Sequence, residues 1–156
     1  MTNFKNIEGI YFVGIGGIGM SALALYFTEG GFPVAGYDRT ESSITDSLKD
    51  RGCSIIFEDD PGKLPSAFLD KNLKDQLLVI YTPAIPAENN ILSYFRNNSY
   101  RLAKRSEILG EISSGTDTIA VAGTHGKTTV STMTAHLLKQ SSVDCSAFLG
   151  GISKNY

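Results

Sequence analysis

Two stretches of the sequence contain residues whose types and spacing could bind phosphate. The later one, "GTHGKTT" at 123–129, places Lys127 and Thr128 at the start of an expected helix. In loops that hold ATP, a lysine here neutralises the β- and γ-phosphates and the next hydroxyl ligates Mg²⁺. The strict pattern also requires a glycine where Val121 stands, but consecutive N–H groups of the loop can still surround an anion. The alternative is a helix N-terminus with a solvated lysine.

The ATP-phosphate prediction covers every residue of this second loop. Its candidate residues are Gly123, Thr124, His125, Gly126, Lys127, Thr128 and Thr129. Lys127 and Thr128 are the catalytic candidates, and Thr128 is the candidate Mg²⁺ ligand. His125 could touch phosphate or serve only to position the loop, whereas His136 is interpreted as a structural residue within the helix.

The first loop lies in "FVGIGGIGMSALAL" at 12–25 and matches G-x-G-x-x-G through Gly14, Gly16 and Gly19. The three glycines would allow a tight turn, close approach of a pyrophosphate and close packing of the helix on its strand. Asp38 ends the next expected strand, where an acidic residue takes a ribose hydroxyl in dinucleotide folds. We predict a nucleotide or pyrophosphate ligand here, with NAD as the first chemical choice. The alternative is that the glycines serve only the turn.

One further stretch follows an expected central strand. In "TPAIP" at 82–86, Thr82 could donate to a phosphate, and a proline-stiffened turn is an equal alternative. Arg105 and Glu107 begin an expected helix, and their simplest interpretation is as surface residues. The sequence shows no Ser/His/Asp or Cys/His arrangement that can be placed.

Alternating strands and helices must position these loops. The expected strands are 9–14, 33–38, 54–57 and 77–83, and the expected helices are 18–31, 43–52, 89–98 and 105–115. The second helix is expected to start with a capping box in which Asp46 replaces the usual Glu. Residues 58–76 are expected to be loop with some helix. This order predicts an α/β fold with a Rossmann-like, doubly wound parallel sheet.

The pattern restarts after "SSGTD" at 113–117. A strand is expected over 118–123, followed by the second loop and a helix over 127–140. One strand-loop-helix unit cannot bury its own apolar faces. We therefore expect a first domain over 1–115 and, over 116–156, the truncated start of a second α/β domain. Its apolar stripe of Val130, Met133, Leu137 and Leu138 should be exposed, fold back on the first domain or pair with another copy.

Composition excludes several classes of function. The 156 residues are 42% hydrophobic with a formal net charge of −2, which fits a soluble globular protein and disfavours nucleic-acid binding. No apolar run reaches the roughly 20 residues of a membrane span. Cys53 and Cys145 are isolated, which disfavours a disulfide framework or zinc site. A cytoplasmic location is the default expectation.

With both loops in view, the chain resembles the Mur ligases, the ATP-dependent amide-forming enzymes of peptidoglycan precursor synthesis. The likeness rests on "GIGGIGMSALA", "RSEILGEI" and "VAGTHGKTT". The second loop, with His at 125, is similar to that of the muramate-side members, and the first loop is similar to that of the alanine-adding members, although "TPAIP" departs from the "SSAI" form common in the latter. The resemblance implies that the first loop serves UDP rather than NAD, with Asp38 near the uracil. The UDP-sugar residues that it implies are Gly14, Ile15, Gly16, Gly17, Ile18, Gly19, Asp38, Arg39, Thr82, Pro83 and Ala84.

The resemblance also implies a three-domain enzyme, of which this chain holds the UDP-sugar domain and the beginning of the central ATPase domain, without the C-terminal domain. The lactoyl carboxylate would take the γ-phosphoryl group of ATP, and the amine of L-alanine would then displace phosphate. A chain with only these parts is expected to be inactive alone. Three rivals stay open: an NAD-dependent oxidoreductase, a free-standing UDP-sugar binding module and a P-loop kinase or GTPase.

Overall fold

The computed structural model describes residues 4–70 and 72–151 of the chain. Its centre is a five-stranded sheet in the order β3-β2-β1-β4-β5, and every neighbouring pair of strands is parallel. The strands are β1 (Gly9–Val13), β2 (Val34–Tyr37), β3 (Ser54–Ile56), β4 (Leu77–Tyr81) and β5 (Arg101–Lys104). This order is that of doubly wound nucleotide-binding sheets. The predicted α/β fold with a parallel sheet is confirmed.

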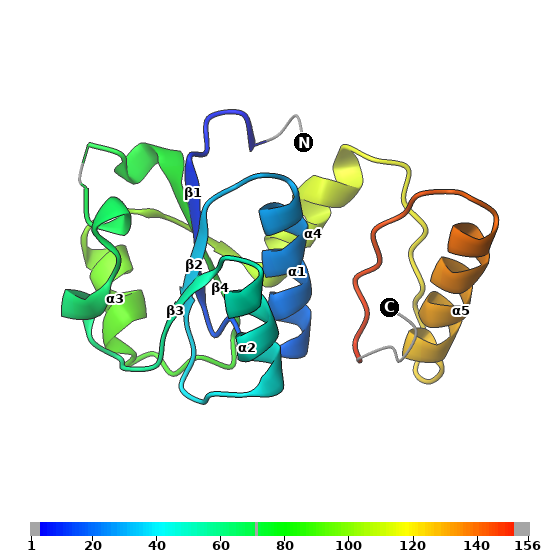
Figure 1. The fold of residues 1–156 in the computed structure, drawn as a ribbon, viewed down its shortest axis with the longest axis horizontal. Helices are drawn as coiled ribbons and strands as arrows, with labels where there is room; N and C mark the ends of the chain where they lie inside the picture. The colour runs from blue at the N-terminus through cyan, green and yellow to red at the C-terminus, as the bar shows by residue number, and fades with distance from the viewer. Residues whose placement is uncertain (1–3, 71, 152–156) are drawn as a thin grey trace.

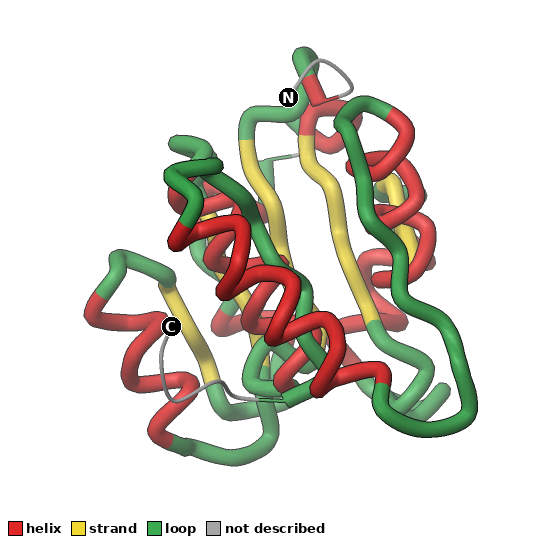
Figure 2. The backbone as a smooth tube through the Cα atoms, turned by 90° about the vertical axis from the view of Figure 1, so that its right-hand side faces the viewer, coloured by secondary structure: helices red, strands yellow, loops and turns green. Residues whose placement is uncertain are grey.

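Helices cover both faces of the sheet, as Figures 1 and 2 show. They are α1 (Ile18–Glu29), α2 (Ser43–Asp50), α3 (Asn90–Asn97), α4 (Arg105–Ser114) and α5 (Lys127–Gln140). Helices α1, α2 and α4 pack on the face that carries Phe12 and Ile80, whereas α3 packs on the opposite face with Tyr11 and Val79. Because β1 and β4 face a core on each side, both strands are apolar along their whole length.

One strand was not expected, whereas the described part of 58–76 is loop with short helical turns, as expected. Strand β5 has no counterpart among the predicted strands, because it is an edge strand in which only Ala103 is buried. The described part of 58–76 contains three short 3₁₀ helices, at Pro61–Lys63, Ser66–Phe68 and Lys74–Gln76. The side chains of Leu64 and Phe68 are buried in the core on the α3 side of the sheet. This segment therefore closes the sheet face that α3 leaves open.

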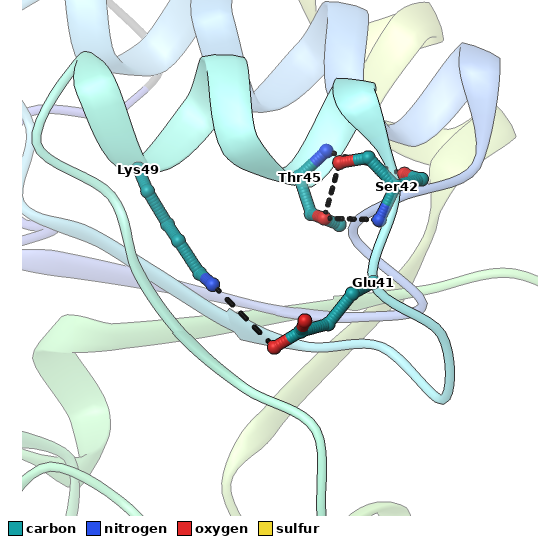
Figure 3. A network of polar contacts seen from close by, with 4 residues as sticks. All are labelled: Glu41, Ser42, Thr45 and Lys49. Atoms are coloured by element: carbon teal, nitrogen blue, oxygen red, sulfur yellow. Dashed lines mark hydrogen bonds and ion pairs between the residues drawn. The ribbon is translucent and has the colours of Figure 1, made fainter.

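The capping box of α2 lies one residue earlier than predicted. The Ser42 hydroxyl accepts the Thr45 N–H at 3.3 Å, and the Thr45 hydroxyl accepts the Ser42 N–H at 2.8 Å (Figure 3). Thr45 is fully buried, whereas Asp46 is exposed in the first turn. The expected role of Asp46 in the box was therefore wrong, because the buried threonine takes the third helical position. An ion pair between Lys49 and Glu41 spans 3.8 Å beside the cap.

The predicted strand over 118–123 is not formed. The segment runs from α4 to α5 without joining the sheet, and Ile119 is 66% exposed. A strand needs a neighbour for its ladder hydrogen bonds, and within the described residues neither edge strand, β3 or β5, pairs with it. The apolar sequence of this segment is therefore insufficient to make it a strand.

Helix α5 forms as expected and lies apart from the sheet, on the far side of α1 in Figure 1. Three residues of its apolar stripe are exposed, Val130 at 49%, Met133 at 60% and Leu137 at 65%, whereas Leu138 is half-buried. The segment after α5 returns toward α1, where Phe148 packs on Tyr26 with ring centroids 5.5 Å apart. Within the part of the chain that the structure describes, no helix has the length and hydropathy that a membrane crossing requires.

Candidate functional site

The first glycine loop joins β1 to α1 by a tight turn. Gly14 has a φ of +89°, which favours glycine because other residues rarely adopt it. The N–H groups of Gly14 and Ile15 both donate to the carbonyl of Tyr37, at 2.7 and 3.0 Å. The loop is thereby tied to the end of β2, and α1 begins after Gly17 with no acidic residue in its first turn.

Asp38 is held against this loop by two backbone donors. The Gly16 N–H donates to Oδ2 of Asp38 at 2.7 Å, and the Thr40 N–H donates to Oδ1 at 3.1 Å. A Cβ on Gly16 would lie 2.9 Å from that Oδ2 and 3.0 Å from Cγ2 of Thr45. The absence of a side chain at Gly16 thus permits the contact with Asp38. Burial, followed by the carboxylates of Asp59 and Asp38, raises the pKa of the neighbouring Tyr37 phenol, so it stays neutral.

A cavity of about 340 Å³ opens beside the loop, where β1, β2 and β4 end. Its lining residues are Gly14, Gly16, Gly17, Asp38, Thr40, Ser42, Thr82, Ala84 and Ile85. Ligands of open parallel sheets bind at the carboxyl ends of the strands where the strand order reverses, here between β1 and β4. The structure thus brings six of the predicted UDP-sugar residues together at one cavity.

The other five predicted UDP-sugar residues do not line this cavity. Ile15 is fully buried beneath the loop, and Ile18 is 41% exposed on the side toward α2. Arg39 and Pro83 are exposed. Gly19 lies in the first turn of α1, against the side chain of Arg105.

Thr40, Ser42 and Ile85 line the cavity but were not among the predicted residues. Thr40 and Ser42 lie in the polar stretch that follows β2, and a search of every residue after a predicted strand would have found them. The Ile85 N–H donates to the Thr82 carbonyl at 3.1 Å, which closes the predicted turn after β4. That turn brings the Ile85 side chain close to Gly14, where an added Cβ would lie 3.0 Å from Cδ1.

The second glycine loop has the geometry of a helix N-terminus but no strand before it. Gly126 caps α5 with a φ of +76°, and the loop residues from Gly123 onward are exposed. The Lys127 ammonium donates to the carbonyls of Gly123 at 2.5 Å and Thr124 at 3.1 Å. The lysine is thus held by carbonyl oxygens of its own loop. His125 is exposed within it.

The residues of this loop fit a phosphate better than they fit a complete metal site. Among the described residues, the backbone N–H groups from Gly123 to Thr129 have no hydrogen-bond acceptor, so they can donate to phosphate oxygens. For Mg²⁺ the loop offers one hydroxyl, that of Thr128, which lies beside Gly150. No group of three or more His, Cys, Asp or Glu side chains that could hold a metal occurs in the described ranges.

A second cavity, of about 640 Å³, lies between α1 and α2 on one side and α5 and the segment after it on the other. Helices α1 and α2 supply one wall through residues such as Tyr26 and Arg51. Lys139 of α5 and Phe148 belong to the opposite wall. The contact of Phe148 with Tyr26 crosses this gap.

Comparison with known proteins places this geometry in a family. The model of the Mur ligase family, catalytic domain, matches residues 9–116. A UDP-N-acetylmuramate–L-alanine ligase of Porphyromonas gingivalis is 58% identical over 150 residues, which are 96% of this chain and 32% of that protein. The protein of that name from Cytophaga hutchinsonii is 49% identical over 154 residues, 99% of this chain and 32% of that protein. The chain thus spans about a third of the length of these relatives.

Solved structures show the same likeness in three dimensions. The UDP-N-acetylmuramate-alanine ligase of Thermotoga maritima superposes with a TM-score of 0.81 at 33% identity, over 94% of this chain and 33% of that one. The UDP-N-acetylmuramate:L-alanyl-gamma-D-glutamyl-meso-diaminopimelate ligase from Neisseria meningitides gives a TM-score of 0.80 at 26% identity, over 96% of this chain and 45% of that one. The family model covers more than half of the sequence and the fold agrees, so the chain belongs to the Mur ligase family.

Proposed function

We propose that this chain is the UDP-sugar-binding part of an ATP-dependent ligase that joins L-alanine to the lactoyl carboxylate of UDP-N-acetylmuramate. The observation that carries the proposal is the cavity between the Gly14–Gly17 loop and Asp38, at the point where the strand order reverses. The names of the relatives supply the substrate. A ligase of this kind draws on ATP and nucleotide sugars, so we place it in the cytoplasm.

The diphosphate of the nucleotide sugar would lie over the start of α1. The Ile15 N–H already donates to Tyr37, whereas the N–H groups of Ile18 and Gly19 have no acceptor among the described residues. These free donors and the helix dipole favour an anion at this point. Asp38, fixed by Gly16 and Thr40, would lie near the uracil with Arg39 at the rim. The turn of Thr82, Pro83 and Ala84 would close the opposite side of the cavity.

The second loop would hold ATP. Gly123 to Thr129 would surround the β- and γ-phosphates with N–H groups, and Lys127 would leave the carbonyls of its own loop to neutralise the γ-phosphoryl group. Such positioned charges stabilise phosphoryl transfer more than the ground state. The Thr128 hydroxyl would be one ligand of a Mg²⁺ ion, whose chemistry is to neutralise phosphate charge.

The reaction would proceed in two transfers. A carboxylate oxygen of the lactoyl group attacks the γ-phosphorus of ATP, ADP leaves and an acyl phosphate forms. The amine of L-alanine then attacks the acyl carbon, and inorganic phosphate leaves with the formation of the amide bond. The contribution of this chain to the first transfer would be to hold the sugar at one loop and the phosphoryl donor at the other.

The two loops would belong to two domains of the longer enzyme. We assign residues 1–115 to the UDP-sugar domain and 116–156 to the opening of the ATP-binding domain. The gap between α1 and α5 and the exposed α5 stripe support this division. Other parts of the enzyme would supply the remaining metal ligands and the L-alanine site, so the chain alone should not catalyse ligation.

Thermal unfolding with added nucleotides tests the proposal. UDP and UDP-N-acetylmuramate should raise the melting temperature, and NAD should not. At a ligand concentration of 100 times Kd the gain is about 2.7 kcal/mol, or roughly 5–10 °C for a domain of this size. A rise with NAD and none with UDP would favour the NAD-dependent oxidoreductase instead.

A further inference from the structure

One cationic side chain lies beside the proposed diphosphate site without belonging to either loop. Arg105 is the first residue of α4 and directly follows β5. Helix α4 packs on the same sheet face as α1, with Ile108 and Leu23 in one core. Because all strands of the sheet are parallel, the carboxyl end of β5 lies at the same end of the sheet as the first loop. This brings Arg105 to the start of α1.

The guanidinium of Arg105 lies on the first turn of α1. A Cβ on Gly19 would be 3.0 Å from Nη1 of Arg105 and 3.3 Å from its Cζ. A side chain on Gly19 would crowd the guanidinium and force it to shift, so the glycine leaves room for Arg105 beside the helix. Arg105 is half-buried there.

The positive charge of Arg105 is not paired with a carboxylate among the described residues. Among the described residues, no hydrogen bond or ion pair engages its guanidinium, unlike that of Arg101, which pairs with Glu111 at 3.4 Å. The first turn of α1 has no acidic residue, and the N-terminal end of the α1 helix dipole is positive. The Arg105 guanidinium and this positive helix end therefore lie together beside the free N–H groups of Ile18 and Gly19. An anion bound there would contact all of them.

We propose that Arg105 is a binding residue for the diphosphate of the nucleotide sugar. This rests on the proposed function. The planar guanidinium would donate to phosphate oxygens from the β5 side while the α1 N–H groups donate from below. Arg105 would thus make the site select a nucleoside diphosphate over the nucleoside alone.

Titrations of the 156-residue chain with UDP and with uridine, followed by NMR, test this role. Arg105→Ala should weaken UDP binding by about tenfold, and by at least threefold, because a charge-assisted hydrogen bond is lost. Its affinity for uridine should stay within twofold of the wild type. Arg105→Lys should recover part of the UDP affinity. The control, Arg101→Ala, removes the same charge from an exposed ion pair at the start of β5 and should leave UDP binding unchanged.

The outcomes separate the inference from the proposed function. A UDP affinity of Arg105→Ala within threefold of the wild type overturns the role of Arg105 alone. A parallel loss of UDP and uridine binding, or a lower melting temperature of the ligand-free variant, also overturns it, because Arg105 would then act through the fold. If the wild-type chain binds neither UDP nor UDP-N-acetylmuramate, the proposed function itself fails.

Discussion

The N–H group of Gly16 donates to a carboxylate oxygen of Asp38 at 2.7 Å and joins the first loop to the end of β2. In the sequence the two residues are 22 positions apart. The contact orients the carboxylate at the cavity wall, and it uses a loop donor that a phosphate could otherwise take. Gly16 therefore serves the site by fixing Asp38, in addition to leaving space for a ligand.

Replacement of Gly16 should disturb both stability and binding. In Gly16→Ala the new Cβ would meet Asp38 Oδ2 and Thr45 Cγ2 at about the distances where overpacking costs roughly 1–3 kcal/mol. The stabilisation by UDP should fall with it, and Gly16→Val should abolish it. Urea unfolding with and without UDP measures both effects. Gly110→Ala is the control, since nothing lies within 4 Å of its Cβ and α4 should gain roughly 0.5–1 kcal/mol.

Two buried tyrosines offer a test of the core. The Tyr11 hydroxyl is buried without a partner in the described residues, whereas that of Tyr100 donates to the Phe68 carbonyl at 3.3 Å. Tyr11→Phe should therefore be neutral or stabilising by about 1 kcal/mol, and Tyr100→Phe should cost about 1 kcal/mol. Equal losses in urea unfolding would contradict this difference.

Tyr11 also leads to a prediction about the stability of the folded chain at alkaline pH. Burial raises the pKa of the Tyr11 phenol above its ordinary value of 10.0, with smaller contributions from Tyr37 and Asp59. In the unfolded chain the phenol loses its proton near pH 10, while the folded chain retains it, so stability should fall as the pH rises above about 10. Tyr11→Phe should reduce the slope of stability against pH in that range.

The sequence identified the central strands because β1 and β4 are continuous apolar runs, buried on both faces. It did not reveal β5, a four-residue edge strand in which Arg101 and Lys104 are exposed and only Ala103 is buried. The role that we propose for Arg105 could not be predicted for the same reason, since its position after a strand depends on β5. The apolar run at 118–123 was read as a strand, but pairing depends on a neighbour that local sequence does not show.

The first loop and Asp38, both singled out from the sequence, line one cavity. Each follows a parallel strand, and the β-α-β repeat fixes the order of those strands in the sheet. Thr40, Ser42 and Ile85 reach the cavity through the cap of α2 and the turn after β4. The polar stretch after β2 could have indicated Thr40 and Ser42, whereas the place of Ile85 depends on the turn after β4, which the glycine pattern does not encode.

Lys127 should matter for turnover rather than for UDP-sugar binding. In the longer enzyme, Lys127→Ala should remove ligation, because the ammonium stabilises charge that shifts during phosphoryl transfer. UDP-sugar affinity should be nearly unchanged. Steady-state kinetics measure the effect, and retention of more than about a tenth of kcat, a loss under ~1.4 kcal/mol, would contradict the role. Thr128→Ala should instead weaken the use of Mg²⁺-ATP.

Helix α5 should be less stable than the sheet. Its exposed Val130, Met133 and Leu137 gain nothing from burial, and an isolated helix of about this length is marginal in water. Hydrogen exchange should show faster exchange over 119–138 than over 10–27, and the exposed stripe should promote self-association at high concentration. Equal protection of the two ranges in a proven monomer would show that α5 belongs to the first domain.

The most direct measurement is NMR mapping of UDP-N-acetylmuramate binding on the amides of the chain. The account predicts the largest saturable shifts at 14–19, 38–42 and 82–85, around the cavity at the carboxyl ends of β1, β2 and β4. Excess UDP should displace the nucleotide sugar and move these amides to their UDP-bound positions, whereas NAD should leave the shifts unchanged. Shifts confined to other segments, or none at concentrations that saturate UDP binding, would contradict the claim that this loop holds the nucleotide sugar.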